Sequence, residues 1–195
     1  GFRVATLDYP QYDRFFGKVI GRYLKGDFGP PIDPHLASII YEADRFETKN
    51  TIKQCLAEGK TVVLNRYVTS NQIHQGARVA PHERKAFLVW LKTLEHKIFG
   101  LPEPDLVLYL HLPAKIAAML TRNKGARGYL GNEKMDQMER DMAHQEASAR
   151  EAMRLAKGSR NWIIINCIKN EQLLSVEEIS SLILAAVLPR LKKRT

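Results

Sequence analysis

The stretch TVVLNRYVTSNQIHQGA, residues 61–77, starts as an apolar, β-branched run and continues as a polar segment, with Arg66 at the junction. Nearly continuous apolar runs of this kind are typical of strands that are buried on both faces. Long amphipathic segments alternate with these runs, so the sequence predicts an α/β fold with a mostly parallel sheet flanked by helices. The other predicted strands are RVATL at 3–7, DLVLYLHL at 105–112 and NWIIINC at 161–167.

The segments between these runs carry helix boundary signals. Asp33 followed by Pro34 combines an N-cap residue with proline at the first helical position, and Gly59 marks the far end, so one helix is predicted over 33–58. A capping box, SVEE at 175–178, opens the last predicted helix. The remaining predicted helices cover 81–99, the segment after Pro113, and 134–157.

Length and composition predict a single domain over 1–195, with 45% hydrophobic and 26% charged residues, as in ordinary globular proteins. No apolar run approaches the roughly 18 residues that a membrane span needs, and the first residues do not resemble a signal peptide. The sequence therefore predicts a cytoplasmic protein without a membrane partner. Cys55 and Cys167 are predicted to be reduced, structural cysteines.

The net charge of +9 favours an anionic partner, such as a nucleotide, a nucleic acid or a membrane surface. Much of the excess lies in the tail at 188–195 and in RNKGAR at 122–127. Proteins that bind nucleic acids typically interleave basic and aromatic residues along one face, and this chain lacks that pattern. No nucleic-acid partner is predicted.

Arg66 follows a predicted parallel strand, at the edge where open α/β sheets bind their ligands. Its planar, permanently charged guanidinium matches a phosphate group. The alternative is a structural arginine paired with a carboxylate at the edge of the sheet.

Residues on either side of Arg66 add the features of a pyrimidine site. Tyr41 and Arg45 are four residues apart and share one helix face, where a ring and a cation can contact a base together. The alternative for this pair is a cation–π contact at the surface, and the alternative for the polar residues downstream is an ordinary polar loop. The downstream residues that can match the hydrogen-bonding edge of a pyrimidine are Ser70, Asn71, His74 and Gln75.

Three quoted stretches resemble the thymidylate kinase family. Residues 41–77, YEADRFETKNTIKQCLAEGKTVVLNRYVTSNQIHQGA, are similar to the family's F-x-A-x-R helix, its strand ending in D-R-Y and its Y-Q-G segment. LDYPQYDRFFGKVIGRYLKGDFG at 7–29 and LPEPDLVLYLHLPAKIAAML at 101–120 match further family segments in the same order. The resemblance implies a P-loop NTPase-like three-layer sandwich and a nucleoside monophosphate kinase, a transferase of nucleotide biosynthesis.

The resemblance also implies roles for the residues of the acceptor site. Arg66 would hold the phosphate of dTMP, Tyr41 would stack on thymine, and Arg45 would bind the base or the same phosphate. His74 replaces a family aromatic residue that crowds the sugar. The other substrate-binding residues implied by the resemblance are Tyr9, Leu24, Ser70, Asn71 and Gln75.

A lid is implied over about 121–140, where a cation would close over the transferred phosphate. The candidate catalytic cations are Arg122 and Arg127, and Lys124 is a candidate for binding ATP. Asn166 lies where the family often has aspartate near the adenine. The alternative for these cations is a basic surface loop.

Two departures from the family pattern affect the expected activity. The chain has no G-x-x-x-x-G-K-[ST] motif, the loop that cradles the phosphates of ATP, so we expect the sequence to lack the first strand and phosphate loop of a longer protein. Asn65 stands in place of the aspartate of the family's D-R pair, keeping its shape without its charge. Asn65 is retained as a catalytic candidate.

The predicted function is transfer of the γ-phosphate of ATP to dTMP, giving dTDP for dTTP biosynthesis, with Mg²⁺ as cofactor and a homodimer as assembly. One alternative is a non-catalytic relative that binds nucleotide, favoured by the absent phosphate loop and by Asn65. The other is a deoxynucleoside kinase, although that family usually has E-R-S where this chain has N-R-Y.

Overall fold

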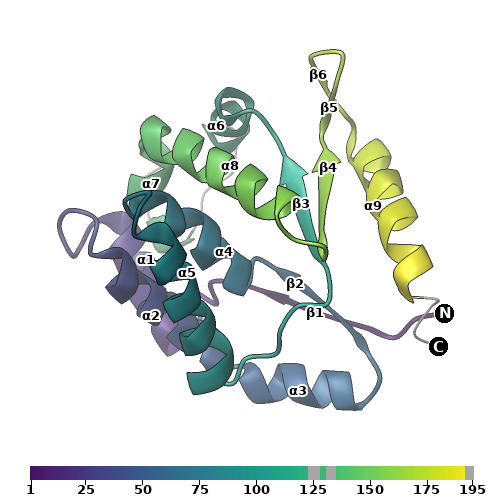
Figure 1. Ribbon diagram of the computed structural model, residues 1–195, viewed down its shortest axis with the longest axis horizontal. Coiled ribbons are helices and arrows are strands. Elements are labelled where there is room, and N and C mark those ends of the chain that lie inside the picture. The colour runs from purple at the N-terminus through teal and green to yellow at the C-terminus, as the bar shows by residue number, and fades with distance from the viewer. Residues whose placement is uncertain (123–127, 131–134, 192–195) are drawn as a thin grey trace.

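The computed structural model describes residues 1–122, 128–130 and 135–191, and Arg122 by its backbone alone. Its strands form two parallel pairs, and Figure 1 shows them between layers of helices. The first pair joins β1 (Val4–Asp8) to β2 (Thr61–Asn65) and the second joins β3 (Val107–His111) to β4 (Trp162–Asn166). A short antiparallel hairpin follows, made of β5 (Ile168–Lys169) and β6 (Gln172–Leu173).

The four predicted strands are therefore present, but the described residues do not join them into one continuous ladder. No pairing links β2 to β3 within the described part of the chain. Apolar side chains remain exposed on these two strands, with Val63 51% and Leu110 46% exposed.

Helices cover both sides of the strand pairs (Figure 1). The pair β3–β4 lies between α8 (Met142–Lys157) and α9 (Val176–Leu191), and α3 (Lys49–Ala57) packs against β2. The remaining elements are α1 (Phe15–Lys25), α2 (Pro34–Phe46), α4 (Val68–His74), η1 (Gly76–Arg78), α5 (Arg84–Lys92), η2 (Thr93–Ile98), α6 (Ala114–Arg122), η3 (Gly128–Leu130) and α7 (Gln137–Arg140). In the described part of the chain, no helix combines the length and apolar character needed to cross a membrane.

The prediction of one continuous helix over 33–58 is wrong in one respect, because the segment divides at Thr48 into α2 and α3. The buried Thr48 hydroxyl lies 2.6 Å from the Tyr9 hydroxyl and donates to the Arg45 carbonyl at 3.3 Å. Side-chain bonds of this kind compete with the helical ladder. The predicted N-cap is confirmed, because the Asp33 carboxylate accepts from the backbone of His35 and Leu36.

Other predicted helices also differ at their boundaries. The segment 134–157 divides into α7 and α8 at Asp141, whose carboxylate accepts from the backbone N–H of His144 at 2.9 Å and so starts α8. The segment 81–99 becomes α5 followed by the π-helix η2. The capping box at 175–178 is confirmed by reciprocal bonds between Ser175 and Glu178.

Two apolar clusters contain residues that the sequence analysis assigned to the site. One contains Tyr9, Ile52, Tyr67 and Val68, and it packs around the point where β1 and β2 end. The other is described by Ile20, Tyr23 and Leu24 of α1. Tyr9 and Leu24 are thus held by buried neighbours, which fixes the wall of any cavity that they line.

Gly17 in α1 provides a stability test of this packing. A Cβ at this position would lie 1.8 Å from the backbone oxygen of Gln11, so Gly17→Ala requires the backbone to move. We expect a loss of unfolding free energy of about 1–3 kcal/mol or more, measured by urea denaturation. Gly158→Ala is the control, because its nearest contact would be an ordinary 3.5 Å, and a loss as large as that of Gly17→Ala would contradict the argument.

Candidate functional site

A cavity of about 390 Å³ opens beyond the carboxyl ends of β1 and β2, between α2, α4 and α8. All nine residues that the sequence analysis predicted to bind the substrate line this cavity. These residues are Tyr9, Leu24, Tyr41, Arg45, Arg66, Ser70, Asn71, His74 and Gln75. They come from four separate segments of the chain, so the fold brings them together.

Arg66 lies at the turn from β2 into α4 and lines this cavity. Its φ of 61° is in the left-handed region, which is uncommon for residues other than glycine and frequent at functional sites. Within the described part of the chain, its guanidinium has no hydrogen bond or ion pair, so the alternative of a structural ion pair is not observed there. An unpaired cation at the rim of a cavity is suited to an anionic ligand.

Arg45 is different, because the residue is only 2% exposed and its side chain is already bonded. Its guanidinium donates to Glu42 Oε1 at 2.7 Å and to the Tyr67 carbonyl at 2.9 Å. The surface cation–π contact considered for Tyr41 and Arg45 is therefore not the arrangement found. Burial raises the pKa of the Tyr41 hydroxyl, so this ring presents a neutral face to the cavity.

Asn71 and Gln75 keep opposite hydrogen-bonding groups available. The Asn71 amide nitrogen donates to the Ser38 carbonyl at 3.2 Å and to Glu42 Oε1 at 2.7 Å, which uses both of its N–H groups and leaves Oδ1 as an acceptor. Gln75 Oε1 accepts from Arg78 at 2.8 Å, which leaves the Gln75 amide N–H groups as donors. The assignment of each amide follows from these bonds.

His74 faces His144 of α8 across the cavity wall, with 5.8 Å between the ring centroids. Burial, with the positive charges of Arg66 and His144 as further causes, lowers the pKa of His74 to about 3. Burial also lowers the pKa of His144. His74 is therefore a neutral ring at physiological pH, like the aromatic residue that it replaces in the family pattern.

The contact between Tyr12 and Tyr129 in the cavity wall was missed by the sequence analysis. Tyr12 stacks on Tyr129 with 4.1 Å between the ring centroids, and the Tyr129 hydroxyl donates to the Asp136 carboxylate at 3.3 Å. Asp136 in turn caps α7, and with Glu139 it forms a capping box. The D-x-x-E spacing was a readable signal for this cap, whereas the Tyr12–Tyr129 contact joins distant segments and leaves no local signature.

The remaining predicted site residues lie outside this cavity. Asn65 and Asn166 are exposed at the ends of β2 and β4 and do not line it. Arg122 ends α6 by its backbone, and Lys124 and Arg127 lie outside the described residues.

Comparison with known proteins decides the family. The family model for thymidylate kinase matches residues 2–179. The chain belongs to the thymidylate kinase family. The predicted family and the phosphotransferase class that it implies are thereby confirmed.

Individual thymidylate kinases show how far the similarity extends. Human thymidylate kinase is 31% identical over 173 residues, which cover 87% of this chain and 71% of the human protein. The thymidylate kinase of Mycobacterium tuberculosis is 27% identical over 170 residues, with coverages of 85% and 78%. A solved structure of the Candida albicans thymidylate kinase is 17% identical to this chain and has a TM-score of 0.70, and the match covers 96% of this chain and 80% of the Candida chain. This structural similarity confirms the predicted fold class.

The neutral state of His74 can be tested through acid stability. Its folded pKa lies below the ordinary value of 6.5, so the unfolded chain binds the additional proton between pH 6.5 and about 3. This residue should therefore make unfolding free energy fall with decreasing pH, by up to about 1.4 kcal/mol per pH unit. His74→Phe should show a shallower fall than the wild type in urea titrations, with His82→Phe as the exposed control. Equal slopes for His74→Phe and the wild type would exclude a buried neutral His74.

Proposed function

We propose that the cavity binds dTMP as phosphate acceptor and that the protein phosphorylates it with the γ-phosphate of ATP, giving dTDP. The observation that supports this most directly is that the Arg66 guanidinium, which has no partner among the described residues, shares one cavity with the Tyr41 ring. Membership of the thymidylate kinase family supports the same reaction.

We propose a role for each contact with dTMP. Arg66 would bind the phosphate oxygens and hold them for in-line attack, with no reorganisation needed to free its charge. The thymine ring would lie against Tyr41, and the Asn71 Oδ1 acceptor would take the N3–H donor of thymine. Gln75 would supply a donor to a carbonyl of the base, and the neutral His74 ring would border the sugar.

The proposal that ATP donates the phosphate is supported by family membership rather than by the geometry of this cavity. Mg²⁺ is typically held by one or two carboxylates together with phosphates and water. Asp8 and Asn65 are partners in the parallel register of β1 and β2, so an anionic and a neutral oxygen donor share one face at the carboxyl edge. These two residues could bind a Mg²⁺ ion that keeps most of its water ligands, and the ion would neutralise charge on the ATP phosphates. No cluster of three His, Cys, Asp or Glu that could hold a metal more fully is found among the described residues.

The other donor-side assignments remain proposals from the family resemblance. Asn166 would lie near the adenine. Arg122, Lys124 and Arg127 would provide the cations that close over the transferred phosphate in a lid over about 121–140.

A second candidate function, nucleotide binding without turnover, is favoured by Asn65 in the place of aspartate. Calorimetry with dTMP and with ATP, followed by a coupled assay for dTDP, separates the two functions. Formation of dTDP supports the kinase, whereas dTMP binding without detectable ATP binding or product supports the second candidate.

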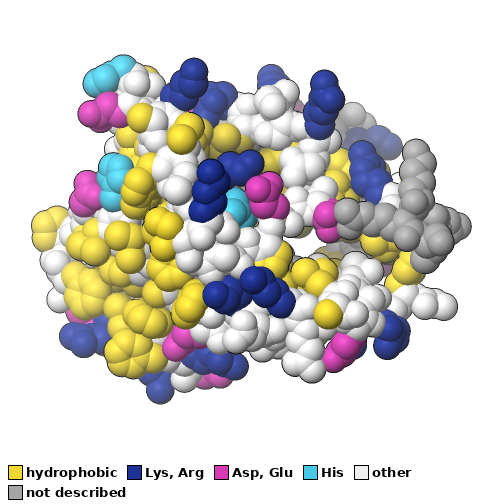
Figure 2. Space-filling model, turned by 60° about the horizontal axis from the view of Figure 1, so that its bottom comes forward, with side chains coloured by type: hydrophobic (Ala, Val, Ile, Leu, Met, Phe, Trp, Pro, Cys, Tyr) yellow, Lys and Arg dark blue, Asp and Glu magenta, His cyan; other side chains and the backbone are white. Residues whose placement is uncertain are grey.

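A homodimer is proposed through α2 and α5, which pack side by side. Leu36 and Ile39 of α2 and Val89 of α5 are exposed apolar residues, and Figure 2 shows a broad area of hydrophobic side chains on this side of the molecule. Such an area is typical of a protein–protein contact. A cytoplasmic location is proposed as well, consistent with free Cys55 and Cys167.

The role of Arg66 is testable by calorimetry with two ligands. Arg66→Ala removes a charge-assisted contact of about 1.5–3 kcal/mol, so dTMP should bind roughly 10- to 150-fold more weakly. Thymidine, which has no phosphate, should bind both proteins alike. Arg160→Ala, at an exposed position outside the cavity, is the control. An equal loss for thymidine and dTMP would contradict a phosphate contact.

The proposed interface is testable by sedimentation velocity. Val89→Glu places a charge in the apolar area and should convert dimer to monomer, because a buried unpaired carboxylate is costly. Met119→Glu, at an exposed position on α6, should leave the dimer intact. A dimer that persists in Val89→Glu would place the interface elsewhere.

A further inference from the structure

Two carboxyl groups are buried behind the wall of the nucleotide cavity, Glu42 on α2 and Glu95 on η2, and both residues are 0% exposed. Glu42 Oε1 accepts from Arg45 and from Asn71, each at 2.7 Å. Within the described part of the chain, Glu42 Oε2 and both oxygens of Glu95 have no hydrogen-bond partner. Three buried carboxyl oxygens thus lack a hydrogen bond of standard geometry, although the Gln72 side chain is close enough to favour a charge on Glu95.

The surrounding groups do not balance two negative charges. Arg45 is bonded to Glu42. The His96 ring lies beside Glu95, with its Nε2 3.8 Å from Glu95 Oε2 and its Nδ1 2.9 Å from the Leu101 carbonyl. An unpaired buried carboxylate costs several kcal/mol or takes up a proton instead.

A single proton on the pair would remove one of the two buried negative charges, and the neutral carboxyl group could then donate a hydrogen bond to the neighbouring carboxylate. We infer that Glu42 and Glu95 share one proton, carried by Glu95, and that this pair positions Arg45 and Asn71 in the nucleotide cavity. The second half of this inference rests on the proposed function, whereas the first half is independent of it.

The electrostatics of the pair place the proton on Glu95. Desolvation, followed by the charge of Glu42, raises the pKa of Glu95, and the opposing effects of Arg45 and Gln72 are smaller. Desolvation also raises the pKa of Glu42, but Arg45 and Asn71 directly favour its charged form. Tyr67 is a further titratable neighbour, and burial raises its pKa, which keeps its hydroxyl neutral.

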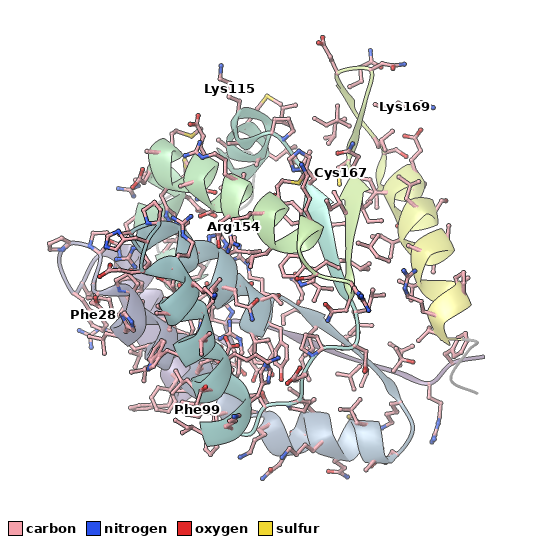
Figure 3. All side chains as sticks on the ribbon, in the orientation of Figure 1. Phe28, Phe99, Lys115, Arg154, Cys167 and Lys169 are labelled. Atoms are coloured by element: carbon pink, nitrogen blue, oxygen red, sulfur yellow. The ribbon has the colours of Figure 1, made fainter. Side chains whose placement is uncertain are left out.

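The segment that carries Glu95 is anchored beside α2 at its end. Glu95 lies in the π-helix η2, a rare form that frequently occurs at functional sites. The end of this segment is anchored beside α2 and α3, because the Phe99 ring packs edge-on against Phe46 at 5.4 Å and the Phe99 carbonyl accepts from Lys49 at 3.0 Å. Figure 3 labels Phe99 at this end of the segment.

The consequence for the cavity is a fixed orientation of the Asn71 amide. An ionised Glu42 can only accept, so it binds the Asn71 N–H and leaves Oδ1 for the ligand. An acceptor at this position matches a pyrimidine with an N3–H, such as thymine, and opposes cytosine, whose N3 is itself an acceptor. The Glu42–Glu95 pair would therefore determine base specificity without touching the base.

The shared proton is tested on the nucleotide-free protein by urea titrations from pH 6 to 9. In the folded protein Glu95 keeps a proton that it loses in the unfolded chain at these pH values. The folding constant of the wild type should therefore fall as the pH rises, by up to about tenfold per pH unit relative to Glu95→Gln. Glu103→Gln, which changes an exposed carboxylate paired with Lys92, is the control and should follow the wild type. Parallel profiles for the wild type and Glu95→Gln would overturn the shared proton.

If Glu95→Gln does not fold, the infrared spectrum of the wild type provides the same test. A protonated-carboxyl C=O band should be present at pH 8 and absent above the pKa of the pair. Absence of this band at pH 8 would equally overturn the inference.

The positioning role is tested by calorimetry with dTMP and dCMP. Glu42→Gln frees the Asn71 amide to turn, so the preference for dTMP over dCMP should fall by about tenfold or more. Glu95→Gln, which still donates to Glu42, should bind dTMP at least tenfold more tightly than Glu95→Leu, which cannot. An unchanged base preference in Glu42→Gln would overturn the positioning role while leaving the stability test of the shared proton intact.

Discussion

The site depends on how the chain leaves β2. The parallel ladder with β1 ends at the pair Asp8 and Asn65, and the next residue, Arg66, turns the backbone with a φ of 61°. This turn buries Tyr67, whose carbonyl then accepts from Arg45, and it starts α4 with its polar residues along the cavity. One backbone conformation thus places Arg66, orients Arg45 and directs the helix that carries the polar groups.

Some charged groups in and behind the cavity are bonded to a group of opposite charge, and others are not. Arg45 is neutralised by Glu42, and His74 is kept neutral by burial and by the nearby positive charges. Arg66 has no such partner among the described residues, so it is the cation available to a phosphate. A cavity arranged in this way can discriminate a nucleotide by its phosphate at one end and by the hydrogen-bonding edge of its base at the other.

Much of the fold and of the site could be predicted from local patterns. Continuous apolar runs located the strands, the Asp33 cap located the start of α2, and the spacing of Tyr41 and Arg45 placed both on one helix face. Boundaries failed where a distant group competes with the local ladder. The break at Thr48 depends on the hydroxyl of Tyr9, which no local pattern around Thr48 contains.

The sequence by itself determined the family, the order of the strands and helices, and the residue types around the cavity, because periodicity, caps and motifs are properties of neighbouring residues. Only the tertiary structure decided which cation is exposed at the cavity and which is buried, how the Asn71 amide is oriented, and that both Glu42 and Glu95 are fully buried. These properties depend on desolvation and on contacts between segments far apart in the chain. The free energy of a buried charge is set by all the groups around it, and those neighbours exist only in the folded protein.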